Sequence, residues 1–230
     1  MPSENPDRHY VGEIGRRYHE VKRGVPECAH IWIARLRARK FSAYVSSDHV
    51  VFEFGVGNGW NLAELDCRRK IGFDVADTVE ERVRLLGIEF IQDTTALADA
   101  IVDVVICHHT LEHLLQPIDA LREMRRLLKL EGRLLLFVPF EKEACYEKFR
   151  PGEQNHHLYS WNAQTLGNLV SETGFNVVEA GIGEFGYSRF AAVWAARFKL
   201  GETGFRVLRR GLHIFRPTFE VRIVARKASA

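Results

Sequence analysis

Cysteine is scarce in this sequence, with four residues among 230, and no two of them are close together. They are Cys28, Cys67, Cys107 and Cys145, and they form no C-x-x-C pair. Zinc knuckles and disulfide frameworks both depend on characteristic cysteine spacings, so neither is expected here. Scattered cysteines of this kind are typical of reduced thiols, and we therefore expect a cytoplasmic protein.

Long hydrophobic stretches are missing as well. No apolar run is long enough to cross a bilayer, and residues 1–10 are polar, unlike the apolar core of a signal peptide. What remains is the composition of an ordinary globular protein, with 46% hydrophobic residues, 27% charged residues and a net charge of +2. At this length we expect one α/β domain with additions.

One glycine-rich stretch, residues 50–59, organises the chain. Val50–Phe54 is an apolar run of β-branched and aromatic side chains, which predicts a strand buried on both faces of a parallel sheet. Glycines then occupy alternate positions: Gly55, Gly57 and Gly59. Glycine permits a positive φ and lets a ligand approach the backbone closely. Trp60–Leu65 can begin a helix, whose first N–H groups would attract electron-rich ligand atoms.

Three nucleotide-binding motifs contain such glycines, and two of them do not fit. A phosphate-binding P-loop would end in Gly-Lys-Ser/Thr, which does not follow Gly59. A dinucleotide fingerprint would need glycine in place of Trp60. The remaining pattern, Glu53 two residues before Gly-x-Gly-x-Gly, resembles motif I of the class I S-adenosylmethionine-dependent methyltransferases. A glycine-rich turn in some other α/β protein is the alternative.

The resemblance implies that this stretch binds S-adenosylmethionine. In that family the acidic residue at the strand end faces the positively charged methionine portion, and the glycine backbone lies against the ligand. The cofactor-binding residues implied here are Glu53, Gly55, Val56, Gly57, Asn58 and Gly59.

Two further strands end in acidic residues. These strands are expected at residues 70–74 and 89–93. Asp74 lies nineteen residues after Gly55, which suits hydrogen bonds from both ribose hydroxyls. Asp93 falls where the methyltransferase family often places an acceptor for the adenine amino group. Thr94 and Thr95 are alternatives for that role, and Asp93 could equally cap a helix.

The most hydrophobic strand, Ile101–Cys107, leads into a histidine-rich loop at its carboxyl end, where open α/β sheets bind ligands. The loop reads His-His-Thr-Leu-Glu-His-Leu over residues 108–114, and we count His108 among the cofactor-binding residues. A helix over 118–130, ended by Glu131-Gly132, and a strand over 133–139 are expected next. This order of elements resembles a widespread small-molecule methyltransferase subfamily over about residues 45–180.

Methyl transfer from a sulfonium needs little acid–base chemistry, because the donor is already activated and positioning supplies much of the rate. Where the acceptor is a hydroxyl, a histidine is the natural base. The candidates are His109 and His157, on loops expected to face the cleft. The other polar residues of these loops, such as His156 and Tyr159, are open to the same role.

A metal site is the alternative for the histidine-rich loop. In ubiquinone-biosynthesis-type O-methyltransferases, metal ligands cluster around a similar Glu-His, which would make His109, Glu112 and His113 the ligands here. The position of His109 is acidic in that pattern, and no second carboxylate is nearby. We therefore expect no metal.

The flanks of the motifs complete the expected fold. Residues 1–46 predict an N-terminal helical cap, with one helix over Tyr10–Val21 and another over His30–Phe41, whose basic cluster is expected to face solvent. The resemblance places such helices over the cofactor, where Tyr10, Tyr18 or Arg23 could reach its carboxylate. Residues 47–230 then form an α/β, Rossmann-like domain of seven mostly parallel strands with helices on both faces.

A helical insertion, residues 186–217, is expected before the last strand. It mixes aromatic and aliphatic residues with arginines, and Gly201 and Gly204 predict its division into two amphipathic helices. Three interpretations stay open: a lid on the acceptor site, a peripheral contact with an anionic membrane, or a face that completes the core over the sheet.

The acceptor is expected to be a small molecule, a lipid or a glycan, and an amphiphilic or anionic, lipid-linked compound would suit the insertion. No nucleic-acid partner is expected, because the net charge is close to zero and no nucleic-acid-binding motif is present. A cofactor-binding module without turnover, or a nicotinamide-dependent oxidoreductase, would be the alternative functions.

Overall fold

The computed structural model describes residues 24–141, 148–149 and 155–228. Within them a seven-stranded sheet has the order β3-β2-β1-β4-β5-β7-β6. Its strands are β1 (Val50–Phe54), β2 (Arg69–Phe73), β3 (Glu89–Ile91), β4 (Val102–His108), β5 (Leu128–Phe140), β6 (Phe175–Glu184) and β7 (Phe219–Lys227). Strand β7 runs antiparallel to both of its neighbours, and the other pairs are parallel. The predicted seven-stranded, mostly parallel sheet is confirmed.

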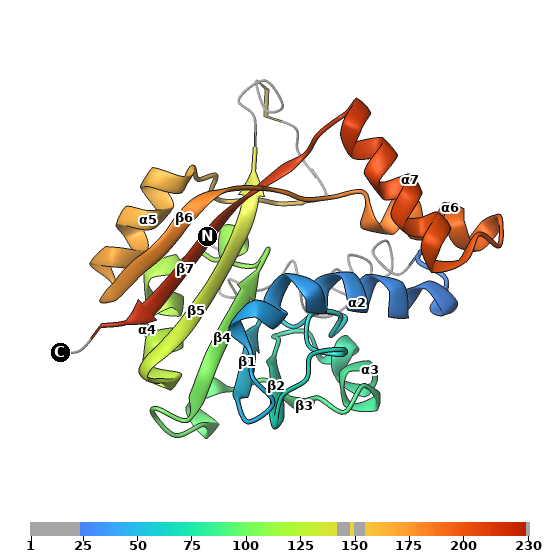
Figure 1. The fold of residues 1–230 in the computed structure, drawn as a ribbon. Helices are drawn as coiled ribbons and strands as arrows, with labels where there is room; N and C mark the ends of the chain where they lie inside the picture. The colour runs from blue at the N-terminus through green and yellow to red at the C-terminus, as the bar shows by residue number, and fades with distance from the viewer. Residues whose placement is uncertain (1–23, 142–147, 150–154, 229–230) are drawn as a thin grey trace.

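Helices cover both faces of the sheet, as predicted (Figure 1). On one face α4 and α5 pack against the alternate residues of the central strands, and on the other α3 and the end of α2 do so. The helices are α2 (His30–Phe41), α3 (Glu80–Leu85), α4 (Pro117–Leu127), α5 (Ala163–Glu172), α6 (Ser188–Arg197) and α7 (Gly201–Phe215). The predicted helix Tyr10–Val21, with Tyr10, Tyr18 and Arg23, lies outside the described residues.

The helix predicted after the glycine motif does not form. Residues 60–64 make turns instead, with single backbone bonds such as that from the Ala63 N–H to the Gly59 carbonyl, 3.0 Å long. The physical reason is the short connection, because the chain must enter β2 at Arg69. Leu62 and Leu65 are buried and hold this turn against the sheet. The argument from a helix N-terminus therefore does not apply at this site.

The boundary between α4 and β5 also differs from the prediction. Helix α4 ends at Leu127, and β5 starts at once rather than after Gly132. The register explains the extra residues, because Val102 faces Leu128 while Val104 faces Arg133. The intervening residues bulge out of the ladder, and Glu131 has a φ of 60° there.

The insertion forms two helices, as predicted, and the break between Arg197 and Gly201 contains two positive φ angles, 54° at Lys199 and 65° at Gly201. Gly201 is the first residue of α7, and Gly204 lies inside that helix, in close contact with Leu200. The helices do not complete the core over the sheet. Their small apolar residues and Phe205 form a separate cluster with α2, beyond the end of the sheet (Figure 1).

No helix in the described part of the chain is long and apolar enough to cross a membrane.

Candidate cofactor and acceptor site

Glycine is required for a different structural reason at each of the three positions after β1. All have positive φ, at 80° for Gly55, 50° for Gly57 and 73° for Gly59. A side chain at Gly55 would collide with Thr110, and one at Gly59 would lie 3.0 Å from Leu86. A Cβ at Gly57 would meet nothing within 4 Å. Gly57 is therefore the glycine whose missing side chain leaves open space beside the backbone.

The residues between these glycines contact β2 and α3. Val56 is buried against Gly72 of β2, so it offers a ligand only its backbone. Its N–H donates to the Phe73 carbonyl at 2.9 Å. The Asn58 side-chain oxygen accepts from Arg82 at 3.4 Å. The turn is thus tied to β2 and to α3.

Asp74 follows β2 directly and supports the same turn. One oxygen of its carboxylate accepts from the Gly57 N–H at 2.8 Å, and the other accepts from the Ala76 N–H at 3.0 Å. Each carboxylate oxygen can accept a second hydrogen bond. Asp74 can therefore fix the Gly57 backbone and still receive ribose hydroxyls, as the sequence predicts.

Glu53 is fully buried at the carboxyl end of β1. Its Oε1 accepts a hydrogen bond from the Asn61 side-chain amide, while its Oε2 is buried without a hydrogen bond among the described residues. Burial raises the pKa of Glu53 to about 8, although the Asn61 hydrogen bond and the Arg37 charge oppose the shift. A buried carboxylate oxygen of this kind suits a cationic ligand.

These observations fit the expected cofactor. The ammonium group of the methionine portion of S-adenosylmethionine matches the buried Glu53 oxygen, and the space beside Gly57 leaves the backbone accessible. The residues themselves therefore support the ligand that the motif implies.

Asp93 takes the alternative role considered for it. It is exposed, and its Oδ1 accepts from the Thr95 N–H at 2.9 Å and from the Thr95 hydroxyl at 2.7 Å. It thereby caps the short helix η4 (Thr94–Ala96). These hydrogen bonds lower the pKa of the Asp93 carboxyl. Its contact with the adenine amino group stays a prediction.

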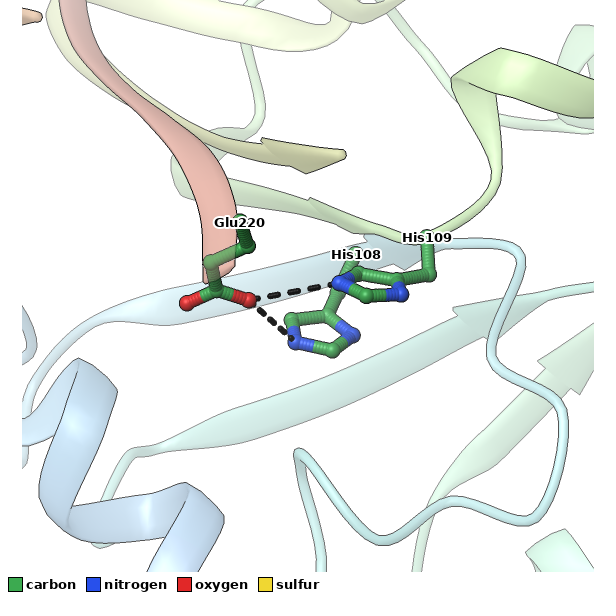
Figure 2. Close-up of side chains that lie close together, drawn as sticks. All are labelled: His108, His109 and Glu220. Atoms are coloured by element: carbon green, nitrogen blue, oxygen red, sulfur yellow. Dashed lines mark hydrogen bonds and ion pairs between the residues drawn. The ribbon is translucent and has the colours of Figure 1, made fainter. Parts of the chain in front are cut away.

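Beyond the glycine turn, a buried cluster of charged and aromatic residues lies at the ends of β4 and β7 (Figure 2). Glu220, which is 1% exposed, accepts from His109 Nε2 at 3.3 Å. The Nε2 atom of His108 is 3.6 Å from the same oxygen, and the two imidazole rings stack 4.4 Å apart. Lys40 of α2 places its Nζ 2.5 Å from the other oxygen of Glu220.

Burial sets the protonation of this cluster. It lowers the pKa of His109 to about 4 despite the opposing Glu220 charge, and that of His108 well below its ordinary value. Burial alone would raise the pKa of Glu220, but hydrogen bonds from the histidines and the Lys40 charge bring it well below its ordinary value. At neutral pH the cluster therefore holds an ionised Glu220 and two neutral imidazoles.

Arg37 connects this cluster to Glu53. Its Nη1 donates to the Asn61 side-chain oxygen at 3.2 Å and lies 2.9 and 3.0 Å from the ring nitrogens of His108. Because Asn61 also donates to Glu53, the network is continuous from β1 to α2 and β4. The basic cluster of α2, expected to face solvent, is thus divided, and that expectation is wrong for Arg37 and Lys40.

Sequence reasoning missed five residues of this site: Arg37, Lys40, Asn61, Phe185 and Glu220. Phe185 packs its ring 4.2 Å from that of His109. The sequence offers one weak signal for Glu220, which is the single acidic residue of the final strand. Arg37 and Lys40 are three residues apart and so share one helix face, but the sequence does not indicate which face points inward.

A second group surrounds the Leu-Glu-His-Leu loop. His113 Nε2 is 3.8 Å from the buried Glu112 carboxylate, and the His113 and His157 rings lie 4.9 Å apart. His157 Nδ1 contacts Glu141 at 2.5 Å. His157 is therefore held next to the loop, whereas His109 belongs to the Glu220 cluster.

This division bears on the metal alternative. Among the described residues, potential metal ligands gather as His108, His109 and Glu220, and as Glu112, His113 and His157. The set His109, Glu112 and His113 is not brought together as one group. In the first group, Arg37 places positive charge beside His108, and Lys40, whose pKa burial lowers to about 7, adds partial charge beside Glu220, which opposes a metal ion. That no metal is used stays a prediction.

Comparison with known proteins agrees with the geometry. A family model described as a methyltransferase domain matches residues 27–180. Two curated proteins of Mycobacterium tuberculosis, from strains CDC 1551 and H37Rv, are 31% identical to the chain over 136 residues. Each is named a probable S-adenosylmethionine-dependent methyltransferase. The match covers 54% of the chain and 48% of each relative, so the chain spans about half the length of the curated relatives it matches.

Solved structures share the fold. An S-adenosylmethionine-dependent methyltransferase of Thermotoga maritima aligns with a TM-score of 0.64 and 18% identity, over 97% of this chain and 100% of that one. A phosphoethanolamine N-methyltransferase of Haemonchus contortus, solved with S-adenosylhomocysteine, aligns with a TM-score of 0.56 and 15% identity, over 85% and 52% of the two chains. At these identities the likeness concerns the fold alone.

The strand order, the glycine turn with its buried Glu53, and the family match over residues 27–180 lead to one assignment. The chain belongs to the methyltransferase-domain family, with the class I fold of enzymes that use S-adenosylmethionine as their cofactor.

Proposed function

We propose that this protein transfers a methyl group from S-adenosylmethionine to a small or amphiphilic acceptor. The observation that carries the proposal is the buried Glu53 oxygen, without a hydrogen bond among the described residues, beside the open space at Gly57. A buried ionisable oxygen without a partner destabilises the fold, so its presence indicates a ligand site. The open space at Gly57 lets that ligand approach the backbone.

Bound S-adenosylmethionine supplies a methyl group on a sulfonium, which makes it transferable without a metal or a redox step. Glu53 would hold the ammonium of the methionine portion, the Gly55–Gly59 backbone would lie against the ligand, and Asp74 would accept from the ribose hydroxyls. Asp93 and His108 would complete the contacts. Asp74 is already ordered by the Gly57 N–H, so this part of the site needs little rearrangement.

His109 is the proposed general base for a hydroxyl acceptor. Glu220 accepts from its Nε2, so the other ring nitrogen is left to accept a proton, on the side away from Glu220 (Figure 2). The ionised Glu220 would stabilise the imidazolium that results. The Lys40 charge limits this effect, so positioning of the acceptor remains the larger contribution. His157, oriented by Glu141, is the second proposed catalytic residue.

The insertion supports an amphiphilic acceptor presented by a membrane. Three aromatic residues form a row along α6 and just past its end, with ring centroids 5.6 and 5.4 Å apart: Phe190, Trp194 and Phe198. They are 52%, 44% and 55% exposed, and Val207 and Ile214 of α7 are exposed as well. Residues 186–217 contain seven Lys or Arg and one Glu, a balance suited to anionic lipid headgroups.

Two experiments test the proposed function. Calorimetry should detect binding of S-adenosylhomocysteine to the wild type, and no binding at all would refute the cofactor site. Cell extracts incubated with methyl-labelled S-adenosylmethionine and analysed by mass spectrometry should then reveal the acceptor. Cofactor binding without transfer to any component would favour the binding module over the enzyme.

The membrane contact needs its own test. Co-sedimentation with vesicles containing anionic lipid should retain the protein at low salt, and replacing Phe190 and Trp194 with Ser should release it. If anionic vesicles retain no protein at low salt, this part of the proposal is wrong.

A further inference from the structure

The inner face of α7 carries a polar residue that the proposed cofactor site does not use. His213 is 6% exposed, and neither of its ring nitrogens has a hydrogen bond among the described residues. The ring of Tyr187 packs edge-on against it at 5.4 Å. Arg209 lies one turn earlier in α7, so it shares this face with His213 and with the buried Phe205. A buried imidazole without a hydrogen bond needs an explanation.

Two arginines of the insertion lie on the elements that flank His213: Arg189 two residues after Tyr187, and Arg209 one turn before His213. Neither Arg189, in the first turn of α6, nor Arg209 makes a hydrogen bond or ion pair with any described residue. Arg209 is partly buried, and Arg189 is exposed. Surrounding protein nevertheless lowers the pKa of both guanidinium groups. The nearby Glu184 charge opposes this effect at Arg209 only.

Both arginines lie close to Arg37 of the site already described. Burial lowers the pKa of Arg37 to about 10, the Glu220 and Glu53 charges oppose this, and the positive charges of Arg189 and Arg209 add to the lowering. The charges of Arg189 in α6 and Arg209 in α7 therefore act on Arg37 in α2, and apolar residues of these three helices pack in one cluster. The mutual repulsion of the three guanidinium groups is a cost to the folded protein that an anion would remove.

The segment 185–187 connects His213 and the arginines to His109. Phe185 contacts His109 with its ring, and the Arg37 guanidinium lies 5.3 Å from the Phe185 centroid. Two residues later Tyr187 contacts His213. The arginines and His213 are thus one short segment away from the proposed base.

We propose that Arg189, Arg209 and His213 form an acceptor subsite for an anionic group, a phosphate or a carboxylate, beneath the α6–α7 pair. The arginines supply the planar donor pairs that these anions prefer, and His213 supplies a further donor. The acceptor would be held by its anion at this end while its nucleophile reaches His109 at the other. The inference rests on the proposed methyl transfer, and it names the substrate class as anionic.

The test uses inorganic phosphate as the probe, with the wild-type protein saturated by S-adenosylhomocysteine so that the cofactor site is filled. Calorimetry should show phosphate binding, and the Arg189→Gln/Arg209→Gln variant should bind it at least about tenfold more weakly, since each lost charged hydrogen bond is worth that much. Arg206→Gln/Arg210→Gln is the matched control, because both residues are exposed on the same insertion. This control should bind phosphate like the wild type.

Three outcomes would overturn the subsite: no phosphate binding to the wild type, equal binding by the Arg189/Arg209 variant, or an equal loss in the control. S-adenosylhomocysteine affinity and the thermal midpoint are measured for every variant, which separates a lost subsite from a lost fold or a lost cofactor site. His213→Phe retains an apolar ring and should weaken phosphate binding without lowering the midpoint. Octyl phosphate binding more tightly than phosphate would identify an amphiphilic ester as the source of the anion, and equal affinity would identify a soluble one.

Discussion

Replacing Glu53 with Gln should make the protein more stable at alkaline pH while removing its cofactor. In the folded chain the buried carboxyl has a pKa of about 8, against an ordinary value of 4.5. Between these values the folded state keeps a proton that the unfolded state releases. Stability therefore falls as the pH rises from about 4.5 to about 8. The amide of the Glu53→Gln variant does not ionise, so the variant escapes this loss.

The magnitude follows from the interval between the two pKa values. At about 1.4 kcal/mol per pH unit, the full interval corresponds to about 5 kcal/mol. Water and side-chain relaxation reduce the cost of buried charge, so we expect about 2–4 kcal/mol by pH 8. The amide carries two N–H donors where the protonated carboxyl carries one O–H, and the extra unpaired donor costs about 1–3 kcal/mol. The difference in unfolding free energy between Glu53→Gln and the wild type should therefore be followed as a function of pH, which is more informative than its value at one pH.

The assay is urea unfolding of the ligand-free wild type and Glu53→Gln from pH 6 to pH 8. The stability of the variant relative to the wild type should rise across this range, and S-adenosylhomocysteine should stabilise the wild type alone. Glu64→Gln, at an exposed carboxyl of the same turn region, is the control and should show no such trend. A difference between Glu53→Gln and wild type that stays constant from pH 6 to pH 8 would refute the reasoning.

Four further predictions follow from the same site. S-adenosylhomocysteine should bind the wild type up to about tenfold more tightly per unit of pH from 6 to 8, because its ammonium requires an ionised Glu53, and calorimetry of Glu53→Gln should detect no binding at any of these pH values. Gly57→Val should abolish that binding, while Gly59→Val, whose side chain meets Leu86 and Ile88, should mainly lower the thermal midpoint. In urea unfolding at pH 6, below the Lys40 pKa of about 7, Lys40→Met should cost about 3–5 kcal/mol by leaving Glu220 without its cation. Adding Glu220→Gln should restore most of this stability, and no recovery would contradict the ion pair. His109→Gln should slow methyl transfer to a hydroxyl acceptor by about 10²–10⁴-fold with unchanged cofactor affinity, and an unaltered rate would remove His109 as the base.

Local patterns determined what could be predicted from the sequence. The apolar run at Val50–Phe54 and the glycines after it have strong local preferences, so the central strand and its turn were predictable. The helix after the turn was not, because the short return to β2 overrides the local preference of Trp60–Leu65. The capping role of Asp93 was recognisable as an alternative, but only the geometry of η4 favours it.

The Glu220 cluster depends on long-range contacts that no local pattern records. Lys40 and Glu220 are 180 positions apart in the chain, and their contact requires α2 to lie against the end of β7. An amphipathic helix shows which residues share a face but not what that face will meet. The division of α2 into an outer face with Arg39 and an inner face with Arg37 and Lys40 therefore emerges only from the packed structure.

The placement of β7 between β5 and β6 has a consequence for the order of folding. Strand β6 stands at the edge of the sheet and pairs with β7, so it cannot join the sheet until the chain has passed through α6 and α7 and returned. Closing a segment of this length is entropically slow compared with local contacts. Glu53 lies in β1 and Asp74 directly follows β2, and these two strands pair with each other, whereas Glu220 belongs to β7 near the end of the chain. A folding intermediate with β1, β2 and β4 in place would therefore contain the elements of the cofactor site. His108 and His109 would contact Glu220 only later, when β7 joins the sheet.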